Sequence, residues 1–159
     1  MKGTIVFDFD YTLADTTRFK KALEIADDEA GVIERMSEFL FPESISVLTR
    51  LKEDGWNLTL VTIGDPAWQE KKVLSSGLHS YFEDIVYTAE PKETHAEKYA
   101  EWPQPLVFIN DHGGELDAIA MVMPGARLIG MSGPKPLPST QNVPVCGTLE
   151  EVYKVVANM

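Results

Sequence analysis

The sequence predicts one α/β domain built around a doubly wound parallel sheet. Short, continuously apolar, β-rich runs alternate with helical patterns along the chain, and strands that are covered on both faces have this composition. Strand alternating with helix is typical of parallel sheets. The 159 residues, of which 44% are hydrophobic, suffice for a single domain with a sizeable core.

Five segments have the composition of such strands: residues 4–8, 57–62, 85–88, 106–110 and 127–131. Helices are expected between them and after the last one, over residues 66–76, 93–102, 115–123 and 148–157. Asp65 and Pro66 suit the N-cap and the first turn of one helix. Thr148 and Glu151 have the spacing of a capping box.

The alternation stops between Leu13 and Trp56, where two helical patterns follow each other over residues 17–30 and 33–52. Gly31 is expected to separate them, and Pro42 to break the second. Because residues 44–52 suit a helix that covers the sheet, the rest, about residues 14–41, is expected to be a small helical insertion. The whole chain, residues 1–159, is then one domain.

The composition restricts the partners. A net charge of −11 repels nucleic acid and anionic membranes, and no apolar stretch approaches the roughly 18 residues of a membrane helix. With no sign of a signal peptide, a soluble cytoplasmic protein is expected. Cys146 is expected to be a buried structural thiol, and residues 133–138, rich in Pro and Gly, a rigid surface loop. The oligomeric state stays open.

Polar side chains follow the predicted strands where each one ends. Asp8 and Asp10 follow the first strand, Thr62 ends the second, Lys92 follows the third and Asp111 the fourth. Parallel strands present their carboxyl ends at one edge of the sheet, where ligands bind. Crowded carboxylates repel one another unless a proton or cation intervenes, and Mg²⁺ prefers such oxygen ligands.

These residues carry a resemblance to a known family. Asp8-x-Asp10-x-Thr12-Leu13 after an N-terminal strand resembles the first signature of the haloacid dehalogenase (HAD) superfamily. Thr62 resembles its second motif, Lys92 its third and Asn110-Asp111 its fourth. The resemblance extends from Thr4 to about Met131 and implies a HAD-type, Rossmann-like core with a small cap inserted after the first motif.

The resemblance also implies roles. Asp8 is expected to be the nucleophile that forms an aspartyl-phosphate. Asp10 is expected to be the general acid and base, with a raised pKa. Mg²⁺ is expected to be held by Asp8, the Asp10 carbonyl and Asp111. Thr62, Gly64 and Lys92 are expected to contact the transferred phosphoryl group.

Three assignments have alternatives. Lys98 could replace Lys92 as the lysine of the third motif. The second acid of the fourth motif could be Glu115, which is the expected metal ligand, or Asp117. Arg18 or Lys20 could bind an anionic part of the substrate, or belong to a solvated helix start.

The expected activity is Mg²⁺-dependent hydrolysis of a phosphomonoester. Asp10 distinguishes the chain from dehalogenases that resemble the namesake, which lack this second aspartate because a halide leaves unprotonated. A small cap suits a small phosphorylated substrate in an open cleft, or a larger phosphorylated molecule. The alternatives are a phosphomutase, which needs a lid that excludes water, and a non-catalytic binding module.

Overall fold

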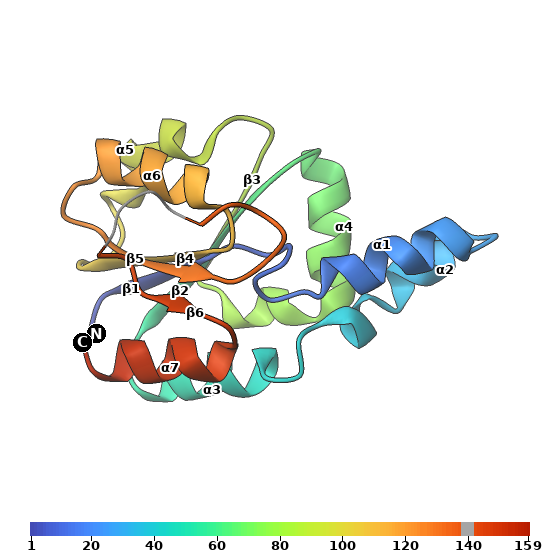
Figure 1. The fold of residues 1–159 in the computed structure, drawn as a ribbon, viewed down its shortest axis with the longest axis horizontal. Helices are drawn as coiled ribbons and strands as arrows, with labels where there is room; N and C mark the ends of the chain where they lie inside the picture. The colour runs from blue at the N-terminus through green and yellow to red at the C-terminus, as the bar shows by residue number, and fades with distance from the viewer. Residues whose placement is uncertain (138–141) are drawn as a thin grey trace.

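The computed structural model describes residues 1–137 and 142–159, and its centre is a six-stranded parallel sheet. The strand order is β3-β2-β1-β4-β5-β6 (Figure 1). The strands are β1 (Thr4–Phe7), β2 (Asn57–Ile63), β3 (Asp84–Thr88), β4 (Leu106–Asn110), β5 (Arg127–Met131) and β6 (Val145–Cys146). The five predicted strands are confirmed. The sixth has only two residues, too few to show a pattern in the sequence.

Helices cover both faces of the sheet (Figure 1). On one face lie α3 (Ser44–Glu53) and α7 (Leu149–Ala157), and on the other α5 (Ala96–Tyr99) and α6 (Gly113–Val122). Side chains alternate between the faces along each strand, so Ile5 and Phe7 belong to one apolar layer and Val6 to the other. The doubly wound α/β sheet expected from the sequence is confirmed.

The segment after β1 forms α1 (Thr16–Ile25), α2 (Glu29–Glu34) and the 3₁₀ helix η1 (Met36–Phe39). The prediction that Gly31 separates two helices is wrong, because Gly31 lies inside α2. The chain breaks earlier, where Ala26 is extended and the Asp28 carboxylate accepts from the Ala30 N–H at 3.1 Å. Such a local N-cap starts a new helix.

Helix α4 (Pro66–Ser76) lies beside this inserted segment (Figure 1). It begins as predicted, because the Asp65 carboxylate accepts from the Ala67 N–H at 3.1 Å and Pro66 occupies the first turn. It ends at Gly77, whose φ of 79° is accessible to glycine at no steric cost. The rings of Trp68 on α4 and Phe19 on α1 have centroids 6.4 Å apart, so the insertion extends the same core.

The remaining helices differ from the predictions in length. The helix expected over residues 93–102 is a 3₁₀ turn, η3 (Lys92–His95), followed by the one-turn helix α5. A further 3₁₀ turn, η2 (Leu78–Tyr81), precedes β3. Helix α6 starts two residues earlier than predicted, because His112 provides its N-cap.

The capping box at α7 forms in a modified way. The Thr148 hydroxyl accepts from the Glu151 N–H at 3.2 Å, while the Glu151 carboxylate accepts from Gly147 instead of from Thr148. The last residue of the loop predicted over 133–138 lies outside the described residues. None of the helices in the described ranges has both the length and the apolar character needed to cross a membrane.

Candidate active site

The carboxyl ends of β1 and β4 place two aspartates together. The strand order changes direction between these neighbouring strands, which is where α/β sheets bind ligands. Asp8 follows β1 and is 7% exposed; Asp111 follows β4 and is 4% exposed. Burial first, and then the hydrogen bond and the charge of Asp8, raise the pKa of Asp111 to about 8. The crowding expected from the sequence is therefore present.

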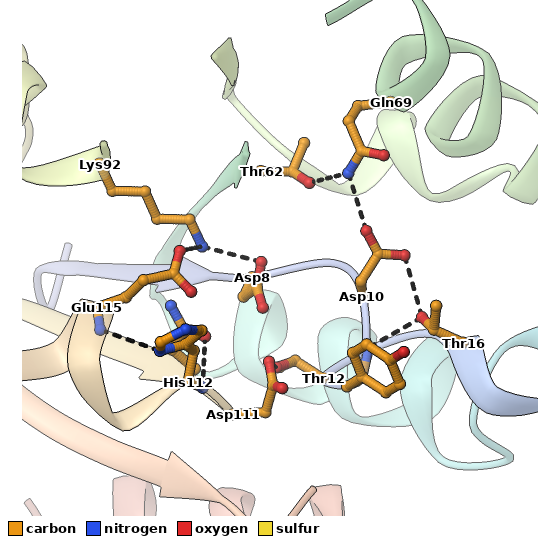
Figure 2. A network of polar contacts seen from close by, with 12 residues as sticks. Asp8, Asp10, Thr12, Thr16, Thr62, Gln69, Lys92, Asp111, His112 and Glu115 are labelled. Atoms are coloured by element: carbon orange, nitrogen blue, oxygen red, sulfur yellow. Dashed lines mark hydrogen bonds and ion pairs between the residues drawn. The ribbon is translucent and has the colours of Figure 1, made fainter. Parts of the chain in front are cut away.

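Lys92 faces this pair from the start of η3 (Figure 2). It is 3% exposed, and its Nζ lies 2.9 Å from Asp8 Oδ1 and 3.2 Å from Glu115 Oε1. Burial lowers the pKa of Lys92, but Asp8 and then Glu115 outweigh burial, so the pKa is raised overall. Lys98 instead pairs with Asp84 at 3.2 Å. Of the two candidate lysines, it is Lys92 that contacts Asp8.

Asp10 turns away from Asp8 and towards α4 (Figure 2). Its Oδ1 accepts from Lys72 Nζ at 2.7 Å and from the Thr16 hydroxyl at 3.0 Å, and its Oδ2 accepts from Gln69 Nε2 at 2.9 Å. Burial raises the pKa of Asp10, but Lys72 and then the other two donors lower it below its usual value. The expected raised pKa is therefore wrong in this arrangement, because the sequence did not reveal that Lys72 pairs with it.

Thr62 and Gly64 are tied to the same helix. The Thr62 hydroxyl accepts a hydrogen bond from Gln69 Nε2, and its residue is 1% exposed. Gly64 is a predicted substrate contact, and its N–H donates to the Thr88 carbonyl at 2.9 Å. Gly64 has a φ of 145°, and a Cβ there would lie 3.2 Å from Gln69 Cγ. Gly64 thus leaves space for Gln69 to reach Asp10.

The turn between Asp10 and Thr12 is strained. Tyr11 has a φ of 62°, a left-handed conformation that costs roughly 1–2 kcal/mol for a residue with a Cβ. The Tyr11 N–H donates to the Thr16 hydroxyl at 3.0 Å, and Thr12 donates its hydroxyl to Asp111 Oδ1 at 3.4 Å. These bonds hold the turn that follows Asp10 and connect it to α1 and to Asp111.

A cavity of about 220 Å³ opens at these strand ends. Of the predicted site residues it is lined by Asp8, Asp10, Asp111 and Glu115, together with Tyr11, Ile63, His112 and Lys135. The expected substrate contacts Thr62, Gly64, Lys92 and Arg18 are not part of this wall. No residue of the segment 14–41, predicted to be an insertion, lines the cavity either.

Arg18 lies on α1, and its side chain contacts residues of the neighbouring η1. Its guanidinium is 5.6 Å from the centroid of the Phe39 ring and donates to the Glu38 carbonyl at 3.5 Å. A cationic residue of the cavity comes instead from Lys135, which follows β5. The same loop passes close to Asp111, because a Cβ at Gly133 would lie 3.3 Å from the Asp111 Cβ.

His112 and Glu115 complete the wall at the start of α6. His112 Nδ1 accepts from the Glu115 N–H at 3.3 Å and caps the helix. Glu115 reaches Lys92, and of the two acids considered for the fourth motif it is Glu115, not Asp117, that lines the cavity.

The side chains at the site provide some, but not all, of the oxygen ligands that a divalent cation needs. Four carboxylates (Asp8, Asp10, Asp111 and Glu115) face two buried ammonium groups (Lys72 and Lys92), which leaves an excess of negative charge. Within residues 1–137 and 142–159, no three Asp, Glu, His or Cys side chains are close enough to form a metal site by themselves. Mg²⁺ usually takes one or two carboxylates and completes its shell with other oxygens, which Asp8 and Asp111 fit.

Sequence reasoning missed Lys72, Gln69 and Lys135. Gln69 and Lys72 are three residues apart on α4, a spacing that puts them on one face, and they share it with Val73 and Ser76, all four being buried. Two long polar residues on the buried face of a helix were the available signal. Lys135 gave no such signal in the sequence, because tertiary contacts place its loop. One of these is the hydrogen bond from the Gly113 N–H to the Pro136 carbonyl at 3.0 Å.

Comparison with known proteins identifies the fold. Residues 19–109 match a family model described as haloacid dehalogenase-like hydrolase. The structure superposes on a predicted phosphatase from Clostridium acetobutylicum with a TM-score of 0.75 and 15% identity, over 100% of both chains. It superposes on the HAD-hydrolase YfnB from Bacillus subtilis, bound to magnesium, with a TM-score of 0.71 and 16% identity over 98% of both chains.

A dehalogenase is about as similar. For L-2-haloacid dehalogenase from Xanthobacter autotrophicus the TM-score is 0.72, with 13% identity over 100% of both chains. The comparison with curated proteins gave no match. At these identities the solved structures establish the shared fold, and the chemistry has to be argued from the site.

Proposed function

The chain belongs to the haloacid dehalogenase-like hydrolases, and from this premise we propose that it is a Mg²⁺-dependent phosphomonoester hydrolase that acts through an aspartyl-phosphate on Asp8. As a member of this family it is an enzyme, and the solved structures that it resembles include a predicted phosphatase and a dehalogenase. The proposal concerns which of these reactions it catalyses.

One observation carries the proposal: a second carboxylate, Asp10, lines the same cavity as Asp8 and Asp111. Displacement of a halide needs no proton donor, whereas the alkoxide that leaves a phosphomonoester does. The resemblance in the first motif agrees, since the namesake dehalogenases lack this aspartate. Asp10 therefore favours phosphoryl transfer.

In the first step the carboxylate of Asp8 attacks phosphorus, and the bond from phosphorus to the leaving oxygen breaks. Asp10 gives its proton to that oxygen, and the alcohol leaves. A phosphate dianion beside Asp10 adds negative charge and favours the protonated form of its carboxyl. Lys92, 2.9 Å from Asp8 Oδ1, holds the nucleophile in place and offsets its charge.

In the second step a water molecule attacks the phosphorus of the aspartyl-phosphate. Asp10, now ionised, takes the proton from that water, and the bond between phosphorus and the Asp8 oxygen breaks. Inorganic phosphate is released, and the Asp8 carboxylate is regenerated. The resting ion pair of Asp10 with Lys72 suits this base role.

Asp8, Asp111 and the carbonyl of Asp10 would hold Mg²⁺, which supplies positive charge next to the phosphoryl oxygens when bound. The acidic excess around Asp8 supports this assignment, as does the raised pKa of Asp111. Glu115 stays a predicted ligand, although it contacts Lys92 here.

The proposed substrate is a small phosphorylated molecule, or the phosphorylated part of a larger one. No residue of the insertion lines the cavity, so the wall leaves room for a leaving group that extends outwards. The same feature favours hydrolysis over a phosphomutase, which has to keep water from its intermediate.

The test is turnover of p-nitrophenyl phosphate with Mg²⁺ by the wild type and by Asp8→Asn. We expect the variant to lose activity by about 10³-fold or more, because an amide cannot form the covalent intermediate. Lys71→Met, a change of an exposed residue on α4, is the control and should keep wild-type activity. Equal turnover by Asp8→Asn, or turnover that chelation of Mg²⁺ leaves unchanged, would refute the proposal.

A further inference from the structure

We propose that Gln69 is a positioning residue that, together with Lys72 and Thr16, fixes the Asp10 carboxylate so that Oδ2 is the oxygen that transfers the proton. The inference rests on the proposed function, in which Asp10 is the acid and base. It adds a residue on α4 and a stated atom to that role.

The hydrogen bonds around Asp10 are distributed unevenly between its two oxygens; Figure 2 shows those to Gln69 and Thr16, and Lys72 adds a third. Oδ1 accepts from Lys72 Nζ at 2.7 Å and from Thr16 Oγ1 at 3.0 Å, whereas Oδ2 accepts from Gln69 Nε2 at 2.9 Å and from no other residue in the described part of the chain. A carboxylate offers about four lone-pair sites, two on each oxygen. Three donors use three of them, so the site left for a proton is on Oδ2.

Gln69 is itself held at both hydrogens of its amide. One goes to Asp10 Oδ2 and the other to the Thr62 hydroxyl. An ionised carboxylate can only accept, and Asp10 is ion-paired with Lys72, so the amide has to present its NH₂ group to Asp10. This orientation cannot reverse without setting two acceptor oxygens against each other.

The surroundings of Gln69 are built for this side chain. Gln69 is 3% exposed and Lys72 4% exposed, so both donors are fixed by packing as well as by hydrogen bonds. Gly64 adds space, because a Cβ at that position would lie 3.2 Å from Gln69 Cγ. Asp10, whose side chain is 23% exposed, is the only member of this group on the cavity wall described above.

A catalytic acid works only when it is held at the atom that needs the proton. Without Gln69, Oδ2 has no hydrogen-bond donor among residues 1–137 and 142–159, and the carboxylate could rotate about its Cβ–Cγ bond. The proton donor would then be misplaced. The loss of kcat/KM should be large for an alkyl ester, because its leaving oxygen needs the proton. It should be small for p-nitrophenyl phosphate, because its leaving group departs as a stable anion.

The experiment measures kcat/KM, which reports on steps up to departure of the leaving group, for glycerol 2-phosphate and for p-nitrophenyl phosphate. For Gln69→Leu we expect the value for the alkyl ester to fall about tenfold more than that for the aryl ester. In an Asp10→Asn background the same change should have no further effect on either ester. Lys71→Met is the matched control on α4, and thermal unfolding verifies that each variant is folded.

An equal loss on both esters, or a loss that persists in the Asp10→Asn background, would show that Gln69 does not act through Asp10. If Gln69→Leu does not fold, Gln69→Met, an unbranched chain of similar length, decides by the same criteria. The two proposals fail separately. Activity retained in Asp8→Asn refutes the proposed function, whereas an inactive Asp8→Asn together with equal losses on the two esters refutes only the role of Gln69.

Discussion

Asp8 and Asp111 are two buried carboxyl groups in contact, and one of them holds a proton at neutral pH when no cation is bound. The pKa of Asp111 is raised to about 8 by burial and by Asp8. In an unfolded chain the pKa of an aspartate is about 3.9. Between these two values the folded state binds more protons than the unfolded state, so the metal-free protein loses stability as the pH rises through this window.

We predict that Asp111→Asn removes this loss. The free energy of unfolding of the metal-free wild type should fall between about pH 5 and pH 8 more steeply than that of Asp111→Asn, because the amide has no proton to lose. Asp10, whose pKa is lowered, is present in both proteins, so its opposite contribution cancels in the comparison. Urea unfolding at several pH values measures the effect, and parallel curves would contradict it.

Mg²⁺ provides a second readout of the same pair. A cation held by Asp8 and Asp111 has to displace the shared proton, so it should bind more tightly above pH 8 than at pH 6. The shift in the unfolding midpoint on adding Mg²⁺ should therefore be larger at the higher pH. An equal shift at both values would place the metal elsewhere.

Helix α4 links the insertion to the catalytic residues at the scale of secondary-structure elements. One side of α4 contacts α2 and η1, and the same helix supplies the two donors that hold Asp10. Phe19 of α1 lies at the junction. The centroid of its ring is 5.6 Å from that of Phe39 and 6.4 Å from that of Trp68. Lys72 Nζ lies 5.7 Å from the same Phe19 centroid. The segment predicted to be an insertion therefore packs against the helix that holds Asp10.

We predict that Phe19→Ala lowers the free energy of unfolding by about 3–5 kcal/mol, because a ring that is 2% exposed leaves a cavity in the core. Phe19→Leu fills most of that space and should cost less than half as much. Urea unfolding compares the two. A stability of Phe19→Ala close to that of the wild type would mean that the insertion packs independently of the sheet.

The protein as a whole is acidic. Its net charge of −11 repels phosphate dianions, and this repulsion acts well beyond the cavity itself. Salt shortens the range of this repulsion, from a Debye length of about 30 Å at 0.01 M to about 8 Å at 0.15 M. Lys135 in the cavity wall acts only at short range, so screening should affect the distant carboxylates more.

We predict that KM for p-nitrophenyl phosphate falls about twofold between 0.01 M and 0.15 M NaCl. Mg²⁺ is kept saturating at both salt concentrations, so that metal affinity does not enter the comparison. Steady-state kinetics provide the measurement. A KM that rises with salt would show that local cations such as Lys135 determine the approach of the substrate.

The local features of the fold were predictable because neighbours in the chain produce them. The apolar strands, the Asp65 and Thr148 caps and the polar residues at strand ends depend on periodicity and on side chains a few positions apart. The errors at this level are also local: a glycine such as Gly31 suggests a helix break, whereas the first helix ends at Ile25 and Gly31 lies inside the next. Two-residue β6 and the one-turn α5 are too short for any pattern.

The sequence by itself determined which residues end the strands at one edge of a parallel sheet, and so which carboxylates can meet. Only the tertiary structure decided with whom each one pairs. Lys92 pairs with Asp8 across 84 residues of sequence, and Lys72 pairs with Asp10 across 62. From the sequence alone, Lys98 or an exposed lysine on α4 is an equally good candidate for either ion pair. The physical reason is that an ion pair depends on the distance between atoms in space, which long-range packing sets and local composition does not.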